Sequence, residues 1–496
     1  MPDHTSAPPR LTKSRFVAGN QCPKQLWWKV HDAGAEELKP DTVLQDRFDQ
    51  GRHVGQLARQ RFPGGALIPP GDDAARVATT KEALASSAPA IYEAAFLLEG
   101  MFVVADILLR EAEGWTLIEV KSSTSQKDEH IPDAAVQVYV ARHRDINVRR
   151  VEIMHLNPEF RHPDTGDLFV RTDVTAEVEK FMTSVPFLAA RFQIALVGPL
   201  PDVDIGLHCF EPRKCPFERR CWPDDPWHIS QLYNTGPKRT ASFLGQGVKS
   251  IRDLPRDKKL PDAARRQLLA LERNEMIVES GLGPALGTAL GDARLGYLDF
   301  ETINRAVPVW NGLGPWRAAV VQFSYHEEGV ASRGQGEGHA HIAYLAEGPY
   351  DPQPEMAERL LEATKNAERI LMYSSYERTQ INQLAERVPA CAGDLKALAG
   401  KMVDLLPLVR DHVYHPGFRG SFSLKYILTP LVPDLTYRDL AIVDGQTASV
   451  EIARLLFVAH LVEDRDQLRR DLLAYCERDT WAMVRLVQRL RELAGI

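Results

Sequence analysis

The chain has 496 residues, of which 44% are hydrophobic and 26% are charged, and its formal net charge is −7. This length fits two or three domains at about 150 residues each, and the composition is that of a globular protein, which excludes a disordered chain. There is no run of the ~20 apolar residues that a transmembrane helix needs, and the N-terminus lacks the apolar core of a signal peptide. We therefore expect a cytoplasmic protein with no membrane partner and with reduced cysteines.

The first half of the chain predicts an α/β domain over residues 1–222. Apolar residues at helical spacing predict a helix over about 42–62. Short β-prone runs separated by glycines predict consecutive strands of a meander over 90–121. Further elements are expected in the order of a helix over 132–144, a strand over 148–157 and a helix over 176–196.

Residues 223–290 are polar, with repeated helix signals, and predict a helical linker. The run 236–255 weakly resembles a helix-hairpin-helix DNA-binding element, and a plain helical spacer explains it as well. A second α/β domain is expected over 291–496. Its predicted strands cover 293–302, 317–329, 340–345 and the start of 369–377, followed by a helix over 377–388 and a helical end over 450–495.

Two pairs of residues in the second domain have the spacing of a metal site. Asp299 and Glu301 are two apart in YLDFET, so on a strand both carboxylates point to one face. Such neighbours repel each other unless a cation lies between them, and hard divalent ions such as Mg²⁺ favour oxygen ligands. An exposed strand edge would give the same pattern. Tyr475 and Asp479 lie at i and i+4 on a predicted helix and share one of its faces.

In chain order, these motifs resemble the DEDD exonucleases, the DnaQ-like branch of the RNase H fold. The family's first motif, DxE, is matched by Asp299 and Glu301. Its aromatic–Asp motif is matched by Tyr376-Glu377, and the YxxxD motif of its tyrosine subclass by Tyr475 and Asp479. The run GSFSLK, which contains Lys425, fits the segment between the last two motifs.

The resemblance departs from the family at two positions. Glu377 stands where Asp is usual, and Tyr373 stands where many members have Asn. Glutamate still supplies a hard oxygen ligand, so the resemblance implies an active 3′→5′ centre in which Tyr475 orients the attacking water. The implied ligands of two Mg²⁺ or Mn²⁺ ions are Asp299, Glu301, Glu377 and Asp479.

A second acidic motif lies in the first domain. Glu119 and Lys121 share one face of a predicted strand, and Asp106 lies on the strand before it. This arrangement resembles the D-x(n)-ExK pattern of the PD-(D/E)XK nucleases, although ExK alone is also a common surface pattern. The resemblance implies a restriction-endonuclease-like domain in which Asp106 and Glu119 bind the metal and Lys121 helps to position water and offset phosphate charge.

Four cysteines flank this motif. Cys22 precedes it, and Cys209, Cys215 and Cys221 follow it at equal spacing. One cysteine before the core and three after it resembles the iron–sulphur RecB-family nucleases, which include the CRISPR spacer-acquisition nuclease and the nuclease domain of the AddB subunit. The resemblance implies a [4Fe–4S] cluster that clasps the two ends of the domain. Four thiolates also suit zinc, but the close CxxC pairs typical of zinc ribbons are absent, which favours Fe–S.

Other positions match these families less closely. Gln137 and Tyr139 resemble the Gln/Tyr motif of the RecB family at a shorter spacing than usual, and Gln137 is the expected catalytic residue. His53 is not expected to be the active-site histidine, and Glu93 is expected on a strand surface. The two remaining cysteines are expected to be ordinary buried thiols: Cys391 and Cys476.

The pairing of these two halves resembles a family of bacterial proteins and gives three hypotheses. In the first, the chain is an exonuclease on single-stranded DNA ends with two centres, the C-terminal one 3′→5′ and the N-terminal one 5′→3′, in DNA repair or defence against foreign DNA. In the second, the substrate is RNA. In the third, the N-terminal half is a decayed nuclease that clamps DNA. A helicase or another repair or defence protein is a compatible partner, and the sequence does not define the oligomeric state.

Overall fold

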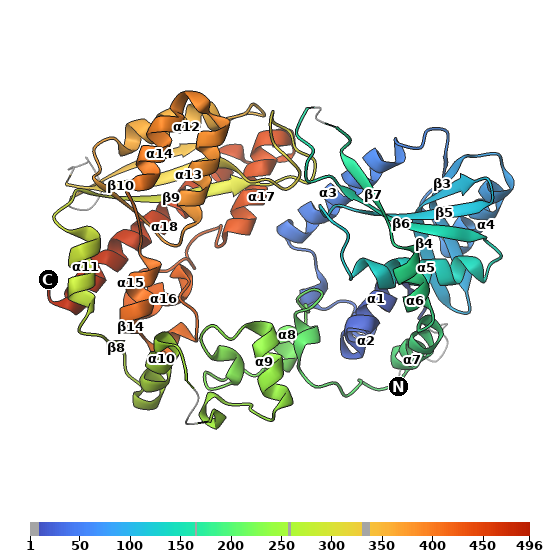
Figure 1. The fold of residues 1–496 in the computed structure, drawn as a ribbon, viewed down its shortest axis with the longest axis horizontal. Coiled ribbons are helices and arrows are strands. Elements are labelled where there is room, and N and C mark those ends of the chain that lie inside the picture. The colour runs from blue at the N-terminus through green and yellow to red at the C-terminus, as the bar shows by residue number, and fades with distance from the viewer. Residues whose placement is uncertain (1–8, 164–165, 256–258, 330–337) are drawn as a thin grey trace. The chain divides into compact units, whose positions relative to one another are not determined.

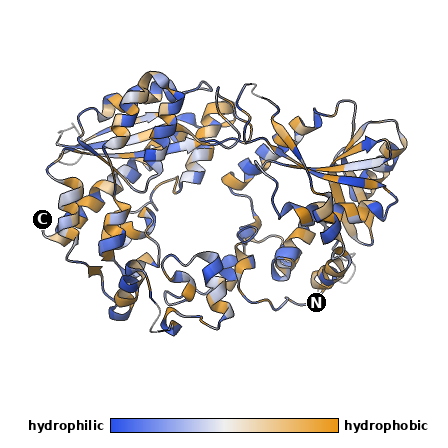
Figure 2. Cartoon of the chain, in the orientation of Figure 1, coloured by the Kyte–Doolittle hydropathy of each residue, from blue (hydrophilic) through white to orange (hydrophobic). Residues whose placement is uncertain are grey.

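The computed structural model describes residues 9–163, 166–255, 259–329 and 338–496, which form two compact units (Figure 1). Unit 1 comprises the described residues up to Trp222 together with Arg305–Val309 and Leu313–Trp316, and unit 2 comprises the others. Both units combine sheets with helices, so the predicted mixed α/β class is confirmed. Figure 2 shows that hydrophobic and hydrophilic residues are mixed along the helices.

Unit 1 is built on a sheet with the strand order β2-β3-β4-β5-β6-β7, to which β1 adds by pairing with β4. The predicted meander is the antiparallel run β3–β4–β5, and β5 continues in parallel to β6. The strands are β1 (Leu11–Thr12), β2 (Ala66–Leu67), β3 (Ala90–Leu98), β4 (Met101–Glu111), β5 (Gly114–Lys121), β6 (Val148–Leu156) and β7 (Phe169–Asp173).

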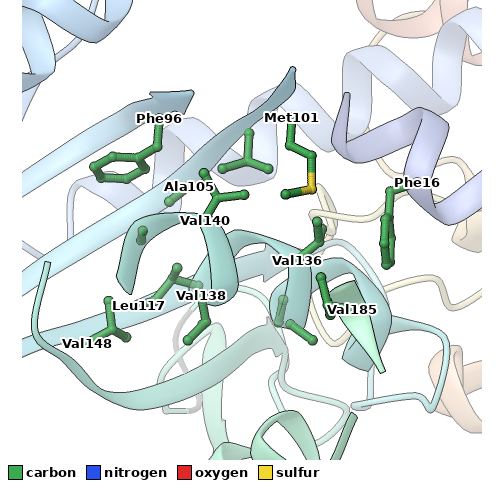
Figure 3. Close-up of a cluster of buried hydrophobic side chains, with 14 of the residues drawn as sticks. Phe16, Phe96, Met101, Ala105, Leu117, Val136, Val138, Val140, Val148 and Val185 are labelled. Carbon is green, nitrogen blue, oxygen red and sulfur yellow. The ribbon is translucent and has the colours of Figure 1, made fainter. Parts of the chain in front are cut away.

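The helix α5 (His130–Arg142) connects β5 to β6 and packs on the sheet, with α1, α6 and α7 around it. Valines and alanines cover most of its surface, so it is buried on almost every side, and Figure 3 shows its valines against Phe96 and Met101 of the strands. The other helices of unit 1 are α1 (Lys13–Gln21), α2 (Pro23–His31), α3 (Thr42–Arg59), α4 (Asp73–Ala85), α6 (Thr175–Met182), α7 (Val185–Val197) and α8 (Glu218–Cys221).

One predicted element of unit 1 is wrong. The helix expected over 176–196 is two helices, α6 and α7, which meet at Thr183 and Ser184. Pro186 lies in the first turn of α7, where its missing N–H costs nothing, but inside a continuous helix it would remove a hydrogen bond. The proline therefore starts a new helix.

A late segment of the chain completes the second face of this sheet. The backbone N–H of Ala306 donates to the side chain of buried Gln50 on α3 at 2.6 Å, and Arg305 pairs with Asp46 at 2.8 Å. The indole N–H of Trp316 donates to the carbonyl of Ser122 at the end of β5. Unit 1 is thus made from two separate parts of the sequence.

Unit 2 contains a sheet with the order β11-β10-β9-β12-β13, antiparallel from β11 to β9 and parallel from β9 to β13. Residues alternate along β9: Leu298 and Phe300 pack toward α12, α13 and α14, whereas Tyr297 packs toward α18. The strands are β9 (Leu295–Ile303), β10 (Ala319–Glu328), β11 (His339–Leu345), β12 (Arg369–Met372) and β13 (Met402–Asp404).

The helices of unit 2 lie on both faces of this sheet, with α12–α14 on one face and α17 and α18 on the other. A separate two-stranded sheet joins β8 (Ile277–Val278) to β14 (Val413–Tyr414). The helices are α9 (Gly236–Gly245), α10 (Asp262–Arg273), α11 (Leu282–Leu290), α12 (Gln353–Thr364), α13 (Tyr376–Arg387), α14 (Ala392–Gly400), α15 (Leu406–His412), α16 (Leu424–Leu431), α17 (Gly445–Phe457) and α18 (Arg465–Ala494). In the described part of the chain, no helix has both the length and the apolar character needed to span a bilayer.

Residues 223–290, predicted as a linker, belong to unit 2. Buried Gln267 on α10 donates to the carbonyl of Gln231 at 2.6 Å and accepts from the N–H of Tyr233. Leu282 and Leu286 of α11 join the core formed with α15, α16 and α18. The run 236–255 forms one helix and a 3-10 turn (Ile251–Asp253), so it does not form a helix-hairpin-helix.

We predict that Gly420→Ala destabilises unit 2 by about 2 kcal/mol or more. Gly420 has φ +75°, and a Cβ atom there would lie 1.9 Å from the carbonyl oxygen of Gln231. Gly287 in α11 is the matched control, because a Cβ there meets nothing within 4 Å. Gly287→Ala should be neutral or stabilising by up to about 1 kcal/mol. Scanning calorimetry would measure both variants, and equal unfolding midpoints would contradict the prediction.

Candidate metal centres

The first candidate centre, centre 1, lies where β4 and β5 of unit 1 run side by side. Ile107 pairs with Ile118, so the next residues along, Asp106 and Glu119, are opposite each other on one face. Glu119 is 1% exposed. Asp106 accepts a hydrogen bond from the backbone N–H of Val120 at 2.8 Å. The hairpin therefore brings the two predicted carboxylates together.

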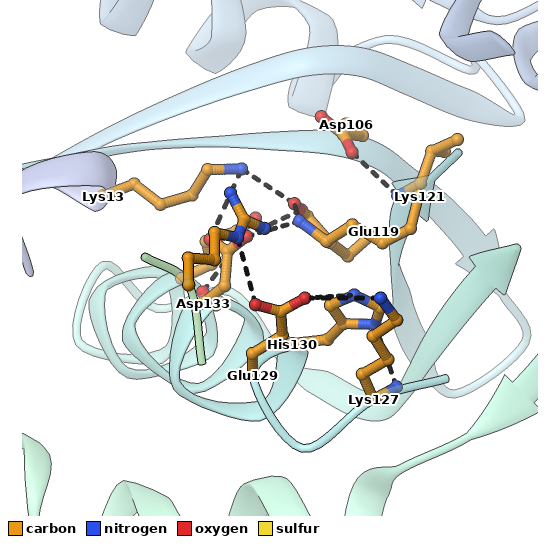
Figure 4. Close-up of polar contacts among 11 residues, drawn as sticks. Lys13, Asp106, Glu119, Lys121, Lys127, Glu129, His130 and Asp133 are labelled. Atoms are coloured by element: carbon orange, nitrogen blue, oxygen red, sulfur yellow. Dashed lines mark hydrogen bonds and ion pairs between the residues drawn. The ribbon is translucent and has the colours of Figure 1, made fainter. Parts of the chain in front are cut away.

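Three cationic or amide side chains hold Glu119 (Figure 4). Lys121 reaches its Oε1 at 2.7 Å from the same strand, and Lys13 of α1 reaches the same atom at 2.9 Å. Gln137 donates to Oε2 at 2.8 Å from α5. One turn before Gln137 on α5, the Asp133 carboxylate accepts a hydrogen bond from the Lys121 ammonium at 2.6 Å. The sequence predicted Lys121 and Gln137 but missed Lys13 and Asp133, because neither lies in the strand motif.

The two facing carboxyls of centre 1 have opposite electrostatic environments. Burial, and then repulsion from Glu119, raises the pKa of Asp106 above its ordinary value. Burial also disfavours ionised Glu119, but Lys121 and Lys13 outweigh it and hold the pKa of this carboxyl below its ordinary value. The centre thus pairs a carboxyl of raised pKa with one of lowered pKa, and a divalent cation would favour ionisation of both.

An open cavity of about 470 Å³ leads to these groups. Asp106, Glu119 and Lys121 form its floor, and α3 forms one wall. Gly51 and Gly55 stand one turn apart on that wall, where a Cβ would meet nothing within 4 Å.

Of three other positions from the sequence, His53 and Tyr139 do not line the cavity, whereas Glu93 does and falls opposite Asp106 in the register of β3 with β4. His53 is exposed on α3. Tyr139 packs its ring against His143, 4.2 Å between centroids. Glu93 lines the cavity wall, where it is paired loosely with Arg59 and Arg76 at 3.7 and 3.8 Å.

The four predicted cluster cysteines are near enough in unit 1 for their thiols to interact electrostatically, and none of them is in a disulfide. Burial, and then the thiols of Cys22, Cys209 and Cys221, raises the pKa of Cys215 to about 11. Cys22, Cys209 and Cys215 are buried. Reduced thiols crowded together in this way form a set of soft ligands, which suits an iron–sulphur cluster or zinc.

The segments carrying these cysteines also bind each other directly. Gln21 donates to the carbonyls of His208 and Arg213 at 2.8 and 2.6 Å, and Arg220 pairs with Asp32 at 2.7 Å. Arg213, between two of the cysteines, reaches Glu129 at the start of α5 at 3.0 Å. The cysteine segment is therefore tied to the helix that carries Asp133 and Gln137.

The second candidate centre, centre 2, lies on the α18 side of the unit 2 sheet. Asp299 and Glu301 of β9 meet Asp479 of α18, and one carboxylate oxygen of each lies within 4.8 Å of the others. Exposures of 7% for Glu301 and 8% for Asp479 show that the cluster is largely closed to water. The strand pair at i and i+2, Asp299 and Glu301, therefore lies beside Asp479 from the helix pair at i and i+4.

Two tyrosines and a lysine surround the three carboxylates. The Tyr475 hydroxyl accepts a hydrogen bond from Lys425 of α16 at 2.9 Å, and the ammonium also lies over the ring. The Tyr437 hydroxyl donates to Asp479. No sequence pattern indicated Tyr437, which lies in a loop between helices.

Glu377 lies close to these carboxylates without joining the group of three. It is 4% exposed on the first turn of α13, and its Oε2 has no hydrogen-bond partner among the described atoms. Burial, and then repulsion from Asp404 and Asp479, raises its pKa to about 8. A buried oxygen of this kind is available to a cation.

Burial and mutual repulsion act together on the carboxyls of centre 2, and burial is the larger cause. Burial raises the pKa of Asp299 well above its ordinary value, and Asp479, Glu377 and Glu301 each add to the rise. The pKa of Glu301 rises for the same reasons, against the opposing charge of Lys425. The donor set consists of hard oxygens, so Mg²⁺ or Mn²⁺ suits it.

One cysteine prediction is wrong and another was incomplete. Cys391 is only partly buried, since it lies in a surface turn before α14. Cys476 is fully buried, as expected, but its Sγ lies 3.6 Å from Asp299 Oδ2 and so contacts centre 2. The neighbouring carboxylates add to the effect of burial and keep the pKa of this thiol high.

Comparison with known proteins gives a family match and a match to a solved structure, among others. Residues 296–423 match the family described as Domain of unknown function (DUF2779), a stretch that includes Asp299, Glu301 and Glu377. No curated protein matches the chain. The crystal structure of an alkaline exonuclease (LHK-Exo) from Laribacter hongkongensis aligns at 13% identity over 37% of this chain and 90% of that chain, with a TM-score of 0.22. At that TM-score the match supports neither a shared fold nor a shared activity.

We predict that Mg²⁺ binding near pH 7 releases about one proton more from the wild-type chain than from Glu377→Gln. The raised pKa of about 8 leaves Glu377 protonated at this pH, and a bound cation displaces that proton. The difference should vanish well above pH 8, where Glu377 is already ionised. Titration calorimetry in two buffers of different ionisation enthalpy measures the released protons.

Glu386→Gln is the matched control for this measurement. Glu386 lies on the same helix but is exposed, so its substitution should leave the proton release unchanged. Equal release from the wild type and Glu377→Gln near pH 7 would show that Glu377 does not take part in cation binding.

Proposed function

We propose that the chain is a metal-dependent nuclease that hydrolyses phosphodiester bonds of DNA, with centre 2 as an exonuclease centre on single-stranded ends. The observation that carries the proposal is the group of half-buried Asp299 with buried Glu301 and Asp479, with oxygens within 4.8 Å of one another. Carboxylates packed so closely need a cation to offset their charge, and divalent cations on such clusters activate phosphoryl chemistry.

In centre 2, these three carboxylates and Glu377 would hold the cations. Bound divalent cations supply a polarised phosphate and a water of lowered pKa. The chain's own contribution is positioning. Lys425 fixes the Tyr475 hydroxyl at 2.9 Å, and that hydroxyl is suited to orient a water for attack on the phosphorus. The resemblance to the tyrosine subclass of DEDD exonucleases supports 3′→5′ polarity.

In centre 1, Asp106 and Glu119 would hold a cation and Lys121 would offset charge on the phosphate. The facing of Asp106 and Glu119 across the β4–β5 hairpin, the Lys121–Glu119 contact at 2.7 Å and the open cavity support a second hydrolytic centre. We propose that it acts with the opposite, 5′→3′ polarity, and that the protein works in DNA repair or in defence against foreign DNA.

A specific observation favours an alternative role for centre 1. Lys13 and Lys121 both contact Glu119, so its charge is already balanced without a metal ion. A centre neutralised in this way would bind the DNA backbone without cutting it, and unit 1 would be a clamp for the exonuclease of unit 2. RNA as the substrate of centre 2 is the other alternative.

We predict that single-stranded DNA labelled at the 5′ or the 3′ end distinguishes these roles. With Mg²⁺ or Mn²⁺, Asp299→Asn should lower 3′→5′ degradation by about 100-fold or more, because it removes a cation ligand. Glu119→Gln should lower only 5′→3′ degradation. Tyr475→Phe should lower kcat with little change in Mg²⁺ affinity, since the hydroxyl orients water and is not a ligand.

Each other outcome has a defined meaning. If Glu119→Gln weakens DNA binding but degradation continues from both ends, the result would support the clamp. Degradation of labelled RNA but not DNA would support the second alternative. A wild-type chain that leaves both nucleic acids intact with either cation would overturn the nuclease proposal.

We also propose that Cys22, Cys209, Cys215 and Cys221 bind a [4Fe–4S] cluster. The nearness of their thiols and the direct contacts between their segments support a clasp across the ends of unit 1. Anaerobically purified protein should be brown, with iron and acid-labile sulphide, and Cys22→Ser should lose both. The partly buried Cys391 is the control, and Cys391→Ser should keep the colour. A colourless wild type that contains zinc would favour zinc at this site.

A further inference from the structure

Unit 2 carries a second group of metal-type ligands, apart from the carboxylates of centre 2. It consists of His326 on β10, His341 on β11 and Glu477 on α18, with one potential ligand atom of each within 4.8 Å of the others. The two histidines face each other across the antiparallel strands, and their rings lie 4.5 Å apart. The Glu477 carboxylate lies 3.6 Å from His341 Nδ1.

In each of the two histidine rings, one nitrogen is within hydrogen-bond distance of a buried hydroxyl group. Thr480 Oγ1 lies 2.8 Å from His326 Nδ1, and Ser324 Oγ lies 2.9 Å from His341 Nε2. The two hydroxyls are also 2.7 Å from each other. The imidazoles are therefore joined through a continuous chain of hydrogen bonds.

The direction of this chain follows from the number of hydrogens. Thr480 Oγ1 also lies 3.0 Å from the carbonyl of Glu477, which can only accept, and we take the one hydroxyl hydrogen of Thr480 as donated there. Toward Ser324 and His326 it can then only accept. Ser324 therefore donates to Thr480 and must accept from the ring of His341.

This direction assigns the protons of both rings. With Thr480 donating to Glu477, His326 carries its proton on Nδ1 and His341 on Nε2, which leaves lone pairs on His326 Nε2 and His341 Nδ1. Burial, and then the neighbouring His341 and His339, lowers the pKa of His326 to about 3, so this ring is neutral at neutral pH. Neutral imidazoles whose second nitrogen is held by a hydrogen bond are the usual form of metal-binding histidines.

We propose that His326, His341 and Glu477 form a site for one Zn²⁺ ion, distinct from the Mg²⁺ or Mn²⁺ centre. Two imidazoles and a carboxylate are ligands that zinc prefers, whereas Mg²⁺ favours oxygen alone. The Glu477 side chain is 38% exposed, so a fourth position is accessible to water. The ion would join β10 and β11 to α18, the helix that also carries Tyr475 and Asp479.

The test counts bound Zn²⁺ without nucleic acid, so its result does not depend on nuclease activity. Protein saturated with Mg²⁺ is titrated with Zn²⁺ against a chromophoric chelator. His341→Ala and Glu477→Gln should each bind one Zn²⁺ fewer than the wild type, and Asp299→Asn should bind the same number as the wild type. Glu477→Gln is nearly isosteric and partly exposed, so it keeps the test valid if His341→Ala does not fold.

Two further measurements separate this site from the cysteines and test the hydrogen-bond chain. Co²⁺ in the site should give visible bands without thiolate charge transfer, and Glu477→Gln should lose them. Ser324→Ala keeps all three ligands but releases the ring of His341, so Zn²⁺ affinity should fall about 10–100-fold. Equal zinc stoichiometry and affinity in the wild type and Glu477→Gln, or a wild type that binds no zinc at this site, would overturn the proposal.

Discussion

Repulsion between buried carboxylates is the constraint that shapes both units. Placing such groups together in a region of low dielectric is unfavourable unless their charge is offset. In unit 1 two lysines contact Glu119, so only Asp106 is pushed toward its protonated form. In unit 2 one lysine, Lys425, offsets the charge of several carboxylates. The pKa values of Asp299, Glu301 and Glu377 therefore all rise. Unit 2 therefore has the greater need for a cation.

The secondary structure around each centre provides this geometry. In both units the sheet presents two acidic side chains on the face that a helix covers, from paired strands β4 and β5 in unit 1 and from β9 alone in unit 2. The helix adds further polar groups one turn apart. In unit 1 these are Asp133 and Gln137, and in unit 2 they are Tyr475 and Asp479. The opposite face of each central strand is apolar and anchors the sheet, so the acidic residues cannot turn away from the cluster.

The parts of the two centres that were predictable from sequence are those set by local periodicity. Strand alternation placed Asp299 with Glu301, and helical spacing placed Tyr475 with Asp479. Lys13, Tyr437 and the packing of α10 and α11 depend on contacts between residues far apart in the chain, for which one sequence carries no periodic signal. Pro186 could have indicated the break between α6 and α7, because it is favoured in a first turn. The His326–His341 pair depended on the register of β10 with β11, which the sequence does not define.

Unit 1 is built from stretches that lie far apart in the sequence, and this affects the order in which the chain can fold during synthesis. Its second sheet face is complete only when Ala306 binds Gln50 and Trp316 binds Ser122. The ribosome must therefore have made residues 223–304, including the first strand of the unit 2 sheet, before unit 1 has all its contacts. Domains usually fold as units in order of synthesis, from the N-terminus onward. Here the first unit to be made waits for part of the second, and until then the side of α3 that carries Gln50 stays open to solvent.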